Sequence, residues 1–236
     1  MADKLLSGDR KVISVDLRIK SRPVVLTTET AEQAVREASF VSLAHQCICR
    51  AERQCQNYSP GFGCLYLGEG ARGIVAKGNA REITVEEGLD VVRQARELGL
   101  IHMILWTSRE LRALGGDADH ALELCSCCPC CCITRRTGDG MQAYIDGMTG
   151  LGIARADEGC TSCGDCERAC YFKAIYIAED GPEIYADRCK GCGKCEIACR
   201  QGVLKVYPLE QVPVYDNGWE QIPSEEFLGQ ILMTIK

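Results

Sequence analysis

The chain has 236 residues, of which 46% are hydrophobic, so it can bury a substantial core and is predicted to form two domains rather than a disordered segment. Its 27 basic and 33 acidic side chains give a formal net charge of −6, which argues against binding to nucleic-acid phosphates. The opening MADKLLSGDR lacks the apolar run of a signal peptide, and no apolar run is long enough for a membrane span, so the sequence predicts a cytoplasmic protein.

The first predicted elements are two strands and a helix. The segments KVISVDLRI and SRPVVLTT, which begin at Lys11 and Ser21, contain β-branched and alternating apolar residues and predict strands. Thr30 and Gln33 have the spacing of a capping box, and residues 31–44 contain no glycine or proline. We therefore expect a helix over residues 31–44.

A second helix has stronger end signals. Thr84 and Glu87 have capping-box spacing, and Gly99 stands where a C-terminal cap is expected. The apolar stripe of this helix consists of Val85, Leu89, Val92 and Leu98. The run LIHMILW, which begins at Leu100, predicts a buried strand after the helix.

The 18 cysteines are far more than an ordinary protein contains. In a reducing compartment such cysteines are metal ligands or redox groups more often than disulfides. Ten lie in the N-terminal region, and we predict them as metal ligands: Cys47, Cys49, Cys55, Cys64, Cys125, Cys127, Cys128, Cys130, Cys131 and Cys132.

Six of these ten stand within the eight residues of CSCCPCCC. Neighbouring side chains on an extended backbone point to opposite faces. The stretch therefore either turns sharply around one metal site, for example at Pro129, or presents its two faces to two sites. Ten thiolates in this region permit one or two iron–sulfur clusters, or one larger fused cluster, in addition to any bound by the other eight cysteines of the chain. The alternatives are a structural zinc ion bound by Cys47, Cys49, Cys55 and Cys64, and thiols that are free or reversibly oxidised.

An internal repeat occupies the C-terminal half. CTSCGDCERACYFKAIYI begins at Cys160, and CKGCGKCEIACRQGVLKV begins 29 positions later at Cys189. Gly164 matches Gly193, and each copy has the spacing C-x2-C-x2-C-x3-C. This spacing wraps three thiolates around one iron–sulfur cube, while the fourth points toward a second cube.

Residues 153–207 resemble the bacterial two-cluster 4Fe-4S ferredoxins. The resemblance implies that Cys160, Cys163, Cys166 and Cys199 bind one cluster, and that Cys189, Cys192, Cys195 and Cys170 bind the other. Such ferredoxins usually have proline after each fourth cysteine, where this chain has Tyr171 and Arg200. The N-terminal CxC motif and the CxCCxCCC run are similar to those of cysteine-rich ferredoxin-domain proteins of anaerobic microbes, which implies a second iron–sulfur domain.

We predict an α+β fold in which a ferredoxin-like two-cluster domain lies on the C-terminal side of a mixed α/β cysteine-rich domain. The expected boundaries are 1–148 for the cysteine-rich domain, 149–208 for the two-cluster domain and 209–236 for a tail. The tail contains an amphipathic helix whose apolar face consists of Phe227, Leu228, Ile231, Leu232 and Ile235. We expect this face to dock on its own domain, with a partner surface as the alternative.

The sequence favours an electron-transfer protein, or an oxidoreductase subunit, that relays low-potential electrons through two 4Fe-4S clusters and one or two further N-terminal clusters to a partner oxidoreductase. No flavin, nucleotide or haem motif is evident, and no catalytic residue is assigned. A second hypothesis is an iron–sulfur reductase that reduces a disulfide or another small molecule at an N-terminal cluster. A third is a metal-storage or zinc-structured binding module.

Overall fold

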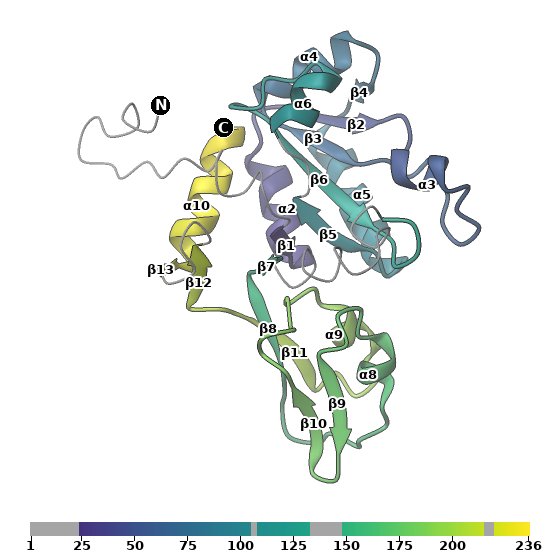
Figure 1. Cartoon of the computed structure of the whole chain (residues 1–236), viewed down its shortest axis with the longest axis vertical. Helices are drawn as coiled ribbons and strands as arrows, with labels where there is room; N and C mark the ends of the chain where they lie inside the picture. The colour runs from purple at the N-terminus through teal and green to yellow at the C-terminus, as the bar shows by residue number, and fades with distance from the viewer. Residues whose placement is uncertain (1–23, 105–107, 133–147, 215–219) are drawn as a thin grey trace.

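The structure is a computed structural model that describes residues 24–104, 108–132, 148–214 and 220–236 (Figure 1). The strand predicted at residues 11–19 lies outside the described residues. The strands are β1 (Val24–Leu26), β2 (Val41–Ala44), β3 (Leu65–Leu67), β4 (Ala80–Glu82), β5 (Ile101–Ile104), β6 (Leu122–Cys127), β7 (Thr149–Gly150), β8 (Gly152–Ala156), β9 (Ile175–Ala178), β10 (Gly181–Ile184), β11 (Leu204–Pro208), β12 (Gln211–Val214) and β13 (Glu220–Pro223). The helices are α2 (Thr28–Glu37), α3 (Ile48–Glu52), α4 (Arg72–Ala76), α5 (Val85–Glu97), α6 (Ser108–Leu114), α8 (Asp165–Ala169), α9 (Lys194–Ala198) and α10 (Ser224–Ile235), with a 3-10 turn at Glu69–Ala71.

Seven strands form one sheet in the order β4-β2-β3-β6-β5-β1-β7. Neighbouring strands are antiparallel except β1 and β7, which are parallel. The run LIHMILW contributes β5, as predicted, and β5 pairs with β6 so that Met103 lies opposite Cys125. The start of the dense cysteine stretch is therefore a central strand of the sheet.

The two faces of this sheet bury different side chains. Leu122 and Leu124 of β6 pack in the core with residues of α2, α5 and α10. Cys125 and Cys127 belong to a separate buried cluster with Met103. This division follows from the alternation of side chains along a strand. One face of the sheet is thus covered by α2, α5 and α10, whereas the other carries these cysteines and, around Tyr66, packs against α4 and α6.

The first predicted helix has different ends in the structure. The N-cap is Thr27, whose side chain accepts a hydrogen bond from the Thr30 backbone N–H at 3.1 Å. The helix ends at Glu37, and residues 41–44 form β2, which pairs with β3 and β4. The predicted capping box at Thr30 and the extension to residue 44 are therefore wrong, because strand pairing overrode helix propensity.

The second predicted helix is confirmed as α5. Thr84 and Glu87 form the reciprocal capping box, and Gly99 follows the helix with a φ of +69°. A glycine tolerates this left-handed conformation because it has no Cβ. The helix delivers the chain directly into β5, which begins at Ile101.

Residues 152–208, called here the repeat domain, form a smaller unit below the sheet (Figure 1). In this unit β8 pairs with β11, and β9 pairs with β10. Gly164 and Gly193 precede α8 and α9 with φ values of 76° and 77°. The repeated sequence is thus a repeated structure, and the combination of helices and strands is of the predicted α+β kind.

The C-terminal helix α10 packs on its own chain. Phe227, Ile231, Leu232 and Ile235 are buried in the core that α2 and α5 share. The backbone N–H of Ser39 donates to the Ile235 carbonyl at 2.8 Å. The expectation that this face docks on its own domain is therefore confirmed. Within the described residues, no helix combines the length and apolar character that crossing a bilayer requires.

Candidate metal centres

The repeat domain contains two pockets, each lined by three cysteines of one repeat and one of the other. One pocket, of about 300 Å³, is lined by Cys160, Cys163, Cys166 and Cys199. The other, of about 310 Å³, is lined by Cys170, Cys189, Cys192 and Cys195. We call these the first and second quartets. The structure brings together the same two sets that the ferredoxin resemblance implies.

The residues of both quartets suit a 4Fe-4S cluster, whose ligands are four cysteine thiolates. Backbone N–H groups donate to several sulfurs, including Ala174 to Cys170 at 3.1 Å and Ala154 to Cys189 at 3.4 Å. Such donors stabilise the negative charge of a bound thiolate. A cluster bound there would take up and release one electron.

The ten N-terminal cysteines divide into two groups. Six line a pocket of about 420 Å³, called here the six-cysteine pocket: Cys47, Cys49, Cys64, Cys125, Cys127 and Cys132. The other four form a tight group: Cys55, Cys128, Cys130 and Cys131. Cys128 also reaches the wall of the six-cysteine pocket. The dense stretch thus combines the two expected arrangements: it turns sharply at Pro129 around the tight group, and its remaining cysteines line the six-cysteine pocket.

This division bears on the alternative zinc site. Cys47, Cys49 and Cys64 line the six-cysteine pocket, but Cys55 lies in the tight group. Because Cys55 follows α3 in a separate loop, the four cysteines of that zinc hypothesis do not converge. The structure brings together a different set of four.

The six-cysteine pocket contains a buried carboxyl group. The Cys64 thiol lies 3.4 Å from the Cys125 sulfur, and the Cys125 thiol donates to Glu123 Oε1 at 3.4 Å. Glu123 is 2% exposed, and its Oε2 has no hydrogen-bond partner among the described residues. Burial raises the pKa of Glu123 well above its ordinary value, because the charged carboxylate is disfavoured away from water.

A buried cation lies at the same pocket. Arg50 is 1% exposed, and its guanidinium donates to the carbonyls of Phe62, at 2.8 Å, and of Ser126. Hydrogen bonds with Cys49 and Cys64 lower the pKa of Cys47, and the neighbouring Arg50 charge acts in the same direction. These interactions therefore favour the thiolate form of Cys47, which is the form that binds metal.

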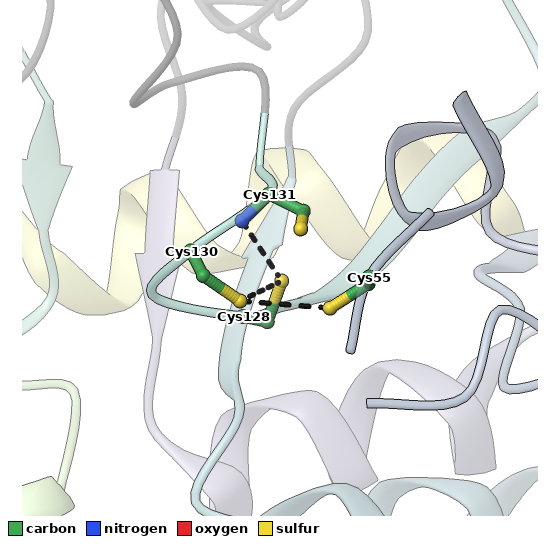
Figure 2. A group of neighbouring side chains, drawn as sticks. All are labelled: Cys55, Cys128, Cys130 and Cys131. Carbon is green, nitrogen blue, oxygen red and sulfur yellow. Dashed lines mark hydrogen bonds between the residues drawn. The ribbon is translucent and has the colours of Figure 1, made fainter. Parts of the chain in front are cut away.

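The tight group converges from two segments of the chain, as Figure 2 shows. Cys55 comes from the loop after α3, and the other three come from the turn after β6. The four sulfurs all lie within 4.8 Å of one another. The Cys130 sulfur is 3.6 Å from that of Cys55 and 3.7 Å from that of Cys128.

Two aromatic residues connect the repeat domain to the six-cysteine pocket. Tyr171 is buried in one cluster with Cys127 and Cys132, and Phe172 and Cys192 pack against this cluster. The two aromatic rings are 4.9 Å apart in an edge-on arrangement. This buried cluster contains no cysteine of the first quartet, although all four are described. The second quartet therefore adjoins the pocket.

Sequence reasoning did not identify Glu123, Arg50 or Tyr171 as residues of a metal centre or of its surroundings. The segment LELCSC did contain a signal for Glu123, because a period of two along a strand places it on the same face as Cys125. For Arg50 there was no such signal, since its partners are backbone carbonyls distant in sequence. Tyr171 stood out only as a departure from proline.

The comparison with known proteins agrees with the geometry of the repeat domain. Residues 159–204 match the family model described as a 4Fe-4S dicluster domain. Among curated proteins, none is similar enough to this chain to count as a match. The matched range contains the four-cysteine motifs of both repeats and leaves the seven-stranded sheet outside. The chain therefore contains an iron–sulfur ferredoxin-like domain.

Proposed function

We propose that the chain is an iron–sulfur electron-transfer protein or an electron-transfer subunit of an oxidoreductase complex. In this proposal the first and second quartets each hold a 4Fe-4S cluster, and the six-cysteine pocket holds a further cluster. The observation that carries the proposal is the packing of Tyr171, Phe172 and Cys192 with Cys127 and Cys132. Electron tunnelling weakens steeply with distance, and this contact brings the second quartet and the pocket close together.

The exposure of the cysteines supports an order for the relay. Cys160 and Cys163 of the first quartet are exposed, whereas all four cysteines of the second quartet are buried or half-buried. The redox partner is therefore proposed to dock near the first quartet. The pocket then lies at the opposite end, next to the second quartet.

The ligand assignment can be tested with one pair of variants. Cys170→Ala should damage the cluster held by Cys189, Cys192 and Cys195, because Cys170 lines their pocket. The matched variant Cys199→Ala should instead damage the cluster of the first quartet. Low-temperature EPR of the anaerobically reduced variants distinguishes the two signals. Loss of the first-quartet signal in Cys170→Ala would contradict the crossed assignment.

The further cluster can be tested by iron and sulfide analysis of the anaerobically purified chain. The two quartets account for about eight irons, and a cluster in the six-cysteine pocket raises this number. Cys127→Ser should lower the total while leaving both quartet signals intact, because Cys127 lines the other pocket. A fully loaded chain with only about eight irons would rule out the pocket cluster and leave the ferredoxin-like domain unaffected.

A second candidate function is an iron–sulfur reductase with its reaction site in the six-cysteine pocket. Two observations favour it: six cysteines exceed the four ligands of one cubane cluster, and the pocket contains the buried carboxyl of Glu123, whose pKa is raised by burial. Reduction of a disulfide consumes two electrons and two protons. The partner would supply the electrons and the solvent would supply the protons, one of them by way of Glu123. Anaerobic turnover of small disulfides with reduced viologen, lowered in Glu123→Gln, would establish this function. Absence of turnover in the fully loaded chain would favour the carrier.

A further inference from the structure

The tight group of Cys55, Cys128, Cys130 and Cys131 is more compact than the ferredoxin quartets. In a 4Fe-4S cluster each thiolate binds a different iron, so the body of the cluster holds the four sulfurs apart. The four sulfurs of the tight group all lie within 4.8 Å of one another, and within the described residues no cysteine of the repeat domain belongs to so tight a metal-binding group. The size of the group therefore indicates a smaller occupant.

The sulfur separations fit a single tetrahedral ion. Four thiolates that bind one zinc ion at about 2.3 Å lie about 3.8 Å from one another, since a tetrahedron's edge is about 1.6 times its centre-to-corner distance. The Cys130 sulfur is 3.6 Å from Cys55 and 3.7 Å from Cys128. A set of four cysteines is also one of the usual ligand sets of structural zinc sites.

The turn after β6 contains a pair of cysteines with the spacing of zinc ligands. Cys128 and Cys131 have the C-x2-C spacing of paired zinc ligands. The Cys131 backbone N–H donates to the Cys128 sulfur at 3.3 Å, as the dashed line in Figure 2 shows. This bond supports negative charge on the sulfur. Pro129 fixes one φ angle within the turn.

The remaining ligand comes from a loop that has little structure of its own. Residues 53–63 contain no helix or strand, and Gln54 has a left-handed φ of +48° directly before Cys55. Arg50 fastens the far end of the loop through the Phe62 carbonyl. A metal at Cys55 would hold the loop's other end against the sheet.

We propose that Cys55, Cys128, Cys130 and Cys131 bind one Zn²⁺ ion, which fastens the 53–63 loop to the turn after β6. The loop follows α3, which carries Cys49 of the six-cysteine pocket, so the ion would also stabilise that wall. This inference is independent of the proposed electron-transfer function. The zinc content of the chain tests the inference, whereas the iron content and the EPR signals test the proposed function.

The test uses the full chain, purified anaerobically from cells supplied with both zinc and iron. We expect about one zinc ion per chain, surrounded by four sulfurs at about 2.3 Å in zinc-edge X-ray absorption. Cys130→Ser should abolish zinc binding and leave iron unchanged. Cys130→His should keep the zinc with three sulfurs and one nitrogen, because Cys130 is exposed and a larger ligand fits there.

Cys49→Ser is the matched control, since Cys49 is half-buried like Cys55 but lines the other pocket. It should retain zinc. Amide hydrogen exchange should accelerate over residues 53–63 in Cys130→Ser and remain slow in Cys130→His. The inference is overturned if Cys130→Ser loses iron while no zinc is present, if the site holds iron in place of zinc, or if Cys49→Ser loses the zinc as well.

Discussion

Tyr171 and Arg200 occupy equivalent positions in the two repeats, yet their surroundings differ. Tyr171 is 7% exposed and packs between the repeat domain and the sheet. The Arg200 side chain is 85% exposed, and its Nε lies 3.5 Å from a carboxylate oxygen of Asp165. Tyr171, in place of the usual proline, therefore provides a contact between the repeat domain and the sheet. Arg200, in place of the other proline, puts a solvated positive charge near the first quartet.

Arg200→Gln should lower the reduction potential of the first-quartet cluster only slightly. Removing a positive charge disfavours the reduced form, but solvent and Asp165 already screen this guanidinium. A unit charge at about 7 Å in a water-like dielectric contributes about 0.6 kcal/mol, or about 25 mV, which is the upper bound expected here. Redox titration at low salt measures it. A fall of the reduction potential by about 100 mV would contradict the solvent exposure of the Arg200 guanidinium and its pairing with Asp165.

His102 should make folding stability depend on pH. It is 2% exposed on β5, and burial lowers its pKa to about 4. The unfolded chain, with a pKa near 6.5, therefore binds more protons than the folded chain as pH falls from about 6.5 to about 4. Stability is complete above this window and is lost as pH falls through it.

The loss between pH 6.5 and 5.5 should be about 1 kcal/mol by linkage. Anaerobic urea unfolding at these two pH values measures the difference for the natural chain and for His102→Gln. The variant has no titrating group at this position, so its stability should change less over the interval. Equal pH dependence in both proteins would show that the pKa of His102 is the same in the folded and the unfolded chain.

At the scale of elements, strands β7 and β8 each have a glycine in close contact with the loop that contains Cys189 and Cys192 of the second quartet. A Cβ on Gly150 of β7 would lie 2.5 Å from the Cα and the carbonyl oxygen of Lys190. A Cβ on Gly191 would lie 2.5 Å from the backbone of Gly152 in β8. Backbone thus packs directly on backbone at the junction of the sheet and the repeat domain.

Gly150→Ala should therefore destabilise the chain by roughly 1–3 kcal/mol, because the added methyl group overpacks rigid backbone. The displaced loop carries Cys189 and Cys192, so the second-quartet cluster should be lost more readily than the first. Denaturant unfolding and EPR measure both effects. The control is Gly229→Ala in α10, where a Cβ meets nothing within 4 Å, and it should stabilise the helix by about 0.5–1 kcal/mol. Equal behaviour of the two variants would contradict this packing.

At the scale of the whole molecule, the repeat domain has its own core and also shares a buried surface with the sheet. Ala154, Ile175 and Leu204 pack with the cysteines of both quartets inside the repeat domain. Tyr171 and Phe172 face the sheet side instead. Lys194 adds a hydrogen bond across the junction, from Nζ to the Gly99 carbonyl at 2.6 Å.

A fragment of residues 150–208 should consequently fold with two clusters, since both quartets and their core lie within it. Anaerobic iron analysis should give about eight irons per fragment. The fragment exposes Tyr171 and Phe172, so it should self-associate more than the full chain in sedimentation experiments. Tyr171→Ser should reduce this association. A fragment that binds no iron would place the domain boundary elsewhere.

The sequence by itself determined the repeat domain, because its information is local. The C-x2-C-x2-C-x3-C spacing and the 29-residue repeat predicted two iron–sulfur sites, and the resemblance to two-cluster ferredoxins implied the two sets of cysteines that line the two pockets. The α5 ends were equally clear from Thr84, Glu87 and Gly99, since caps are contacts between near neighbours in the chain.

Only the tertiary structure decided how the ten N-terminal cysteines divide. Cys47, Cys55 and Cys64 are close in sequence, but sheet pairing sets Cys64 against Cys125 while the loop carries Cys55 to Cys130. No local pattern encodes which distant segments a sheet brings together, because strand order depends on the burial of whole faces. For the same reason Glu123 and Arg50 could not be predicted from the sequence. Both become buried, and Arg50 reaches the Ser126 carbonyl of β6, only when the sheet has formed.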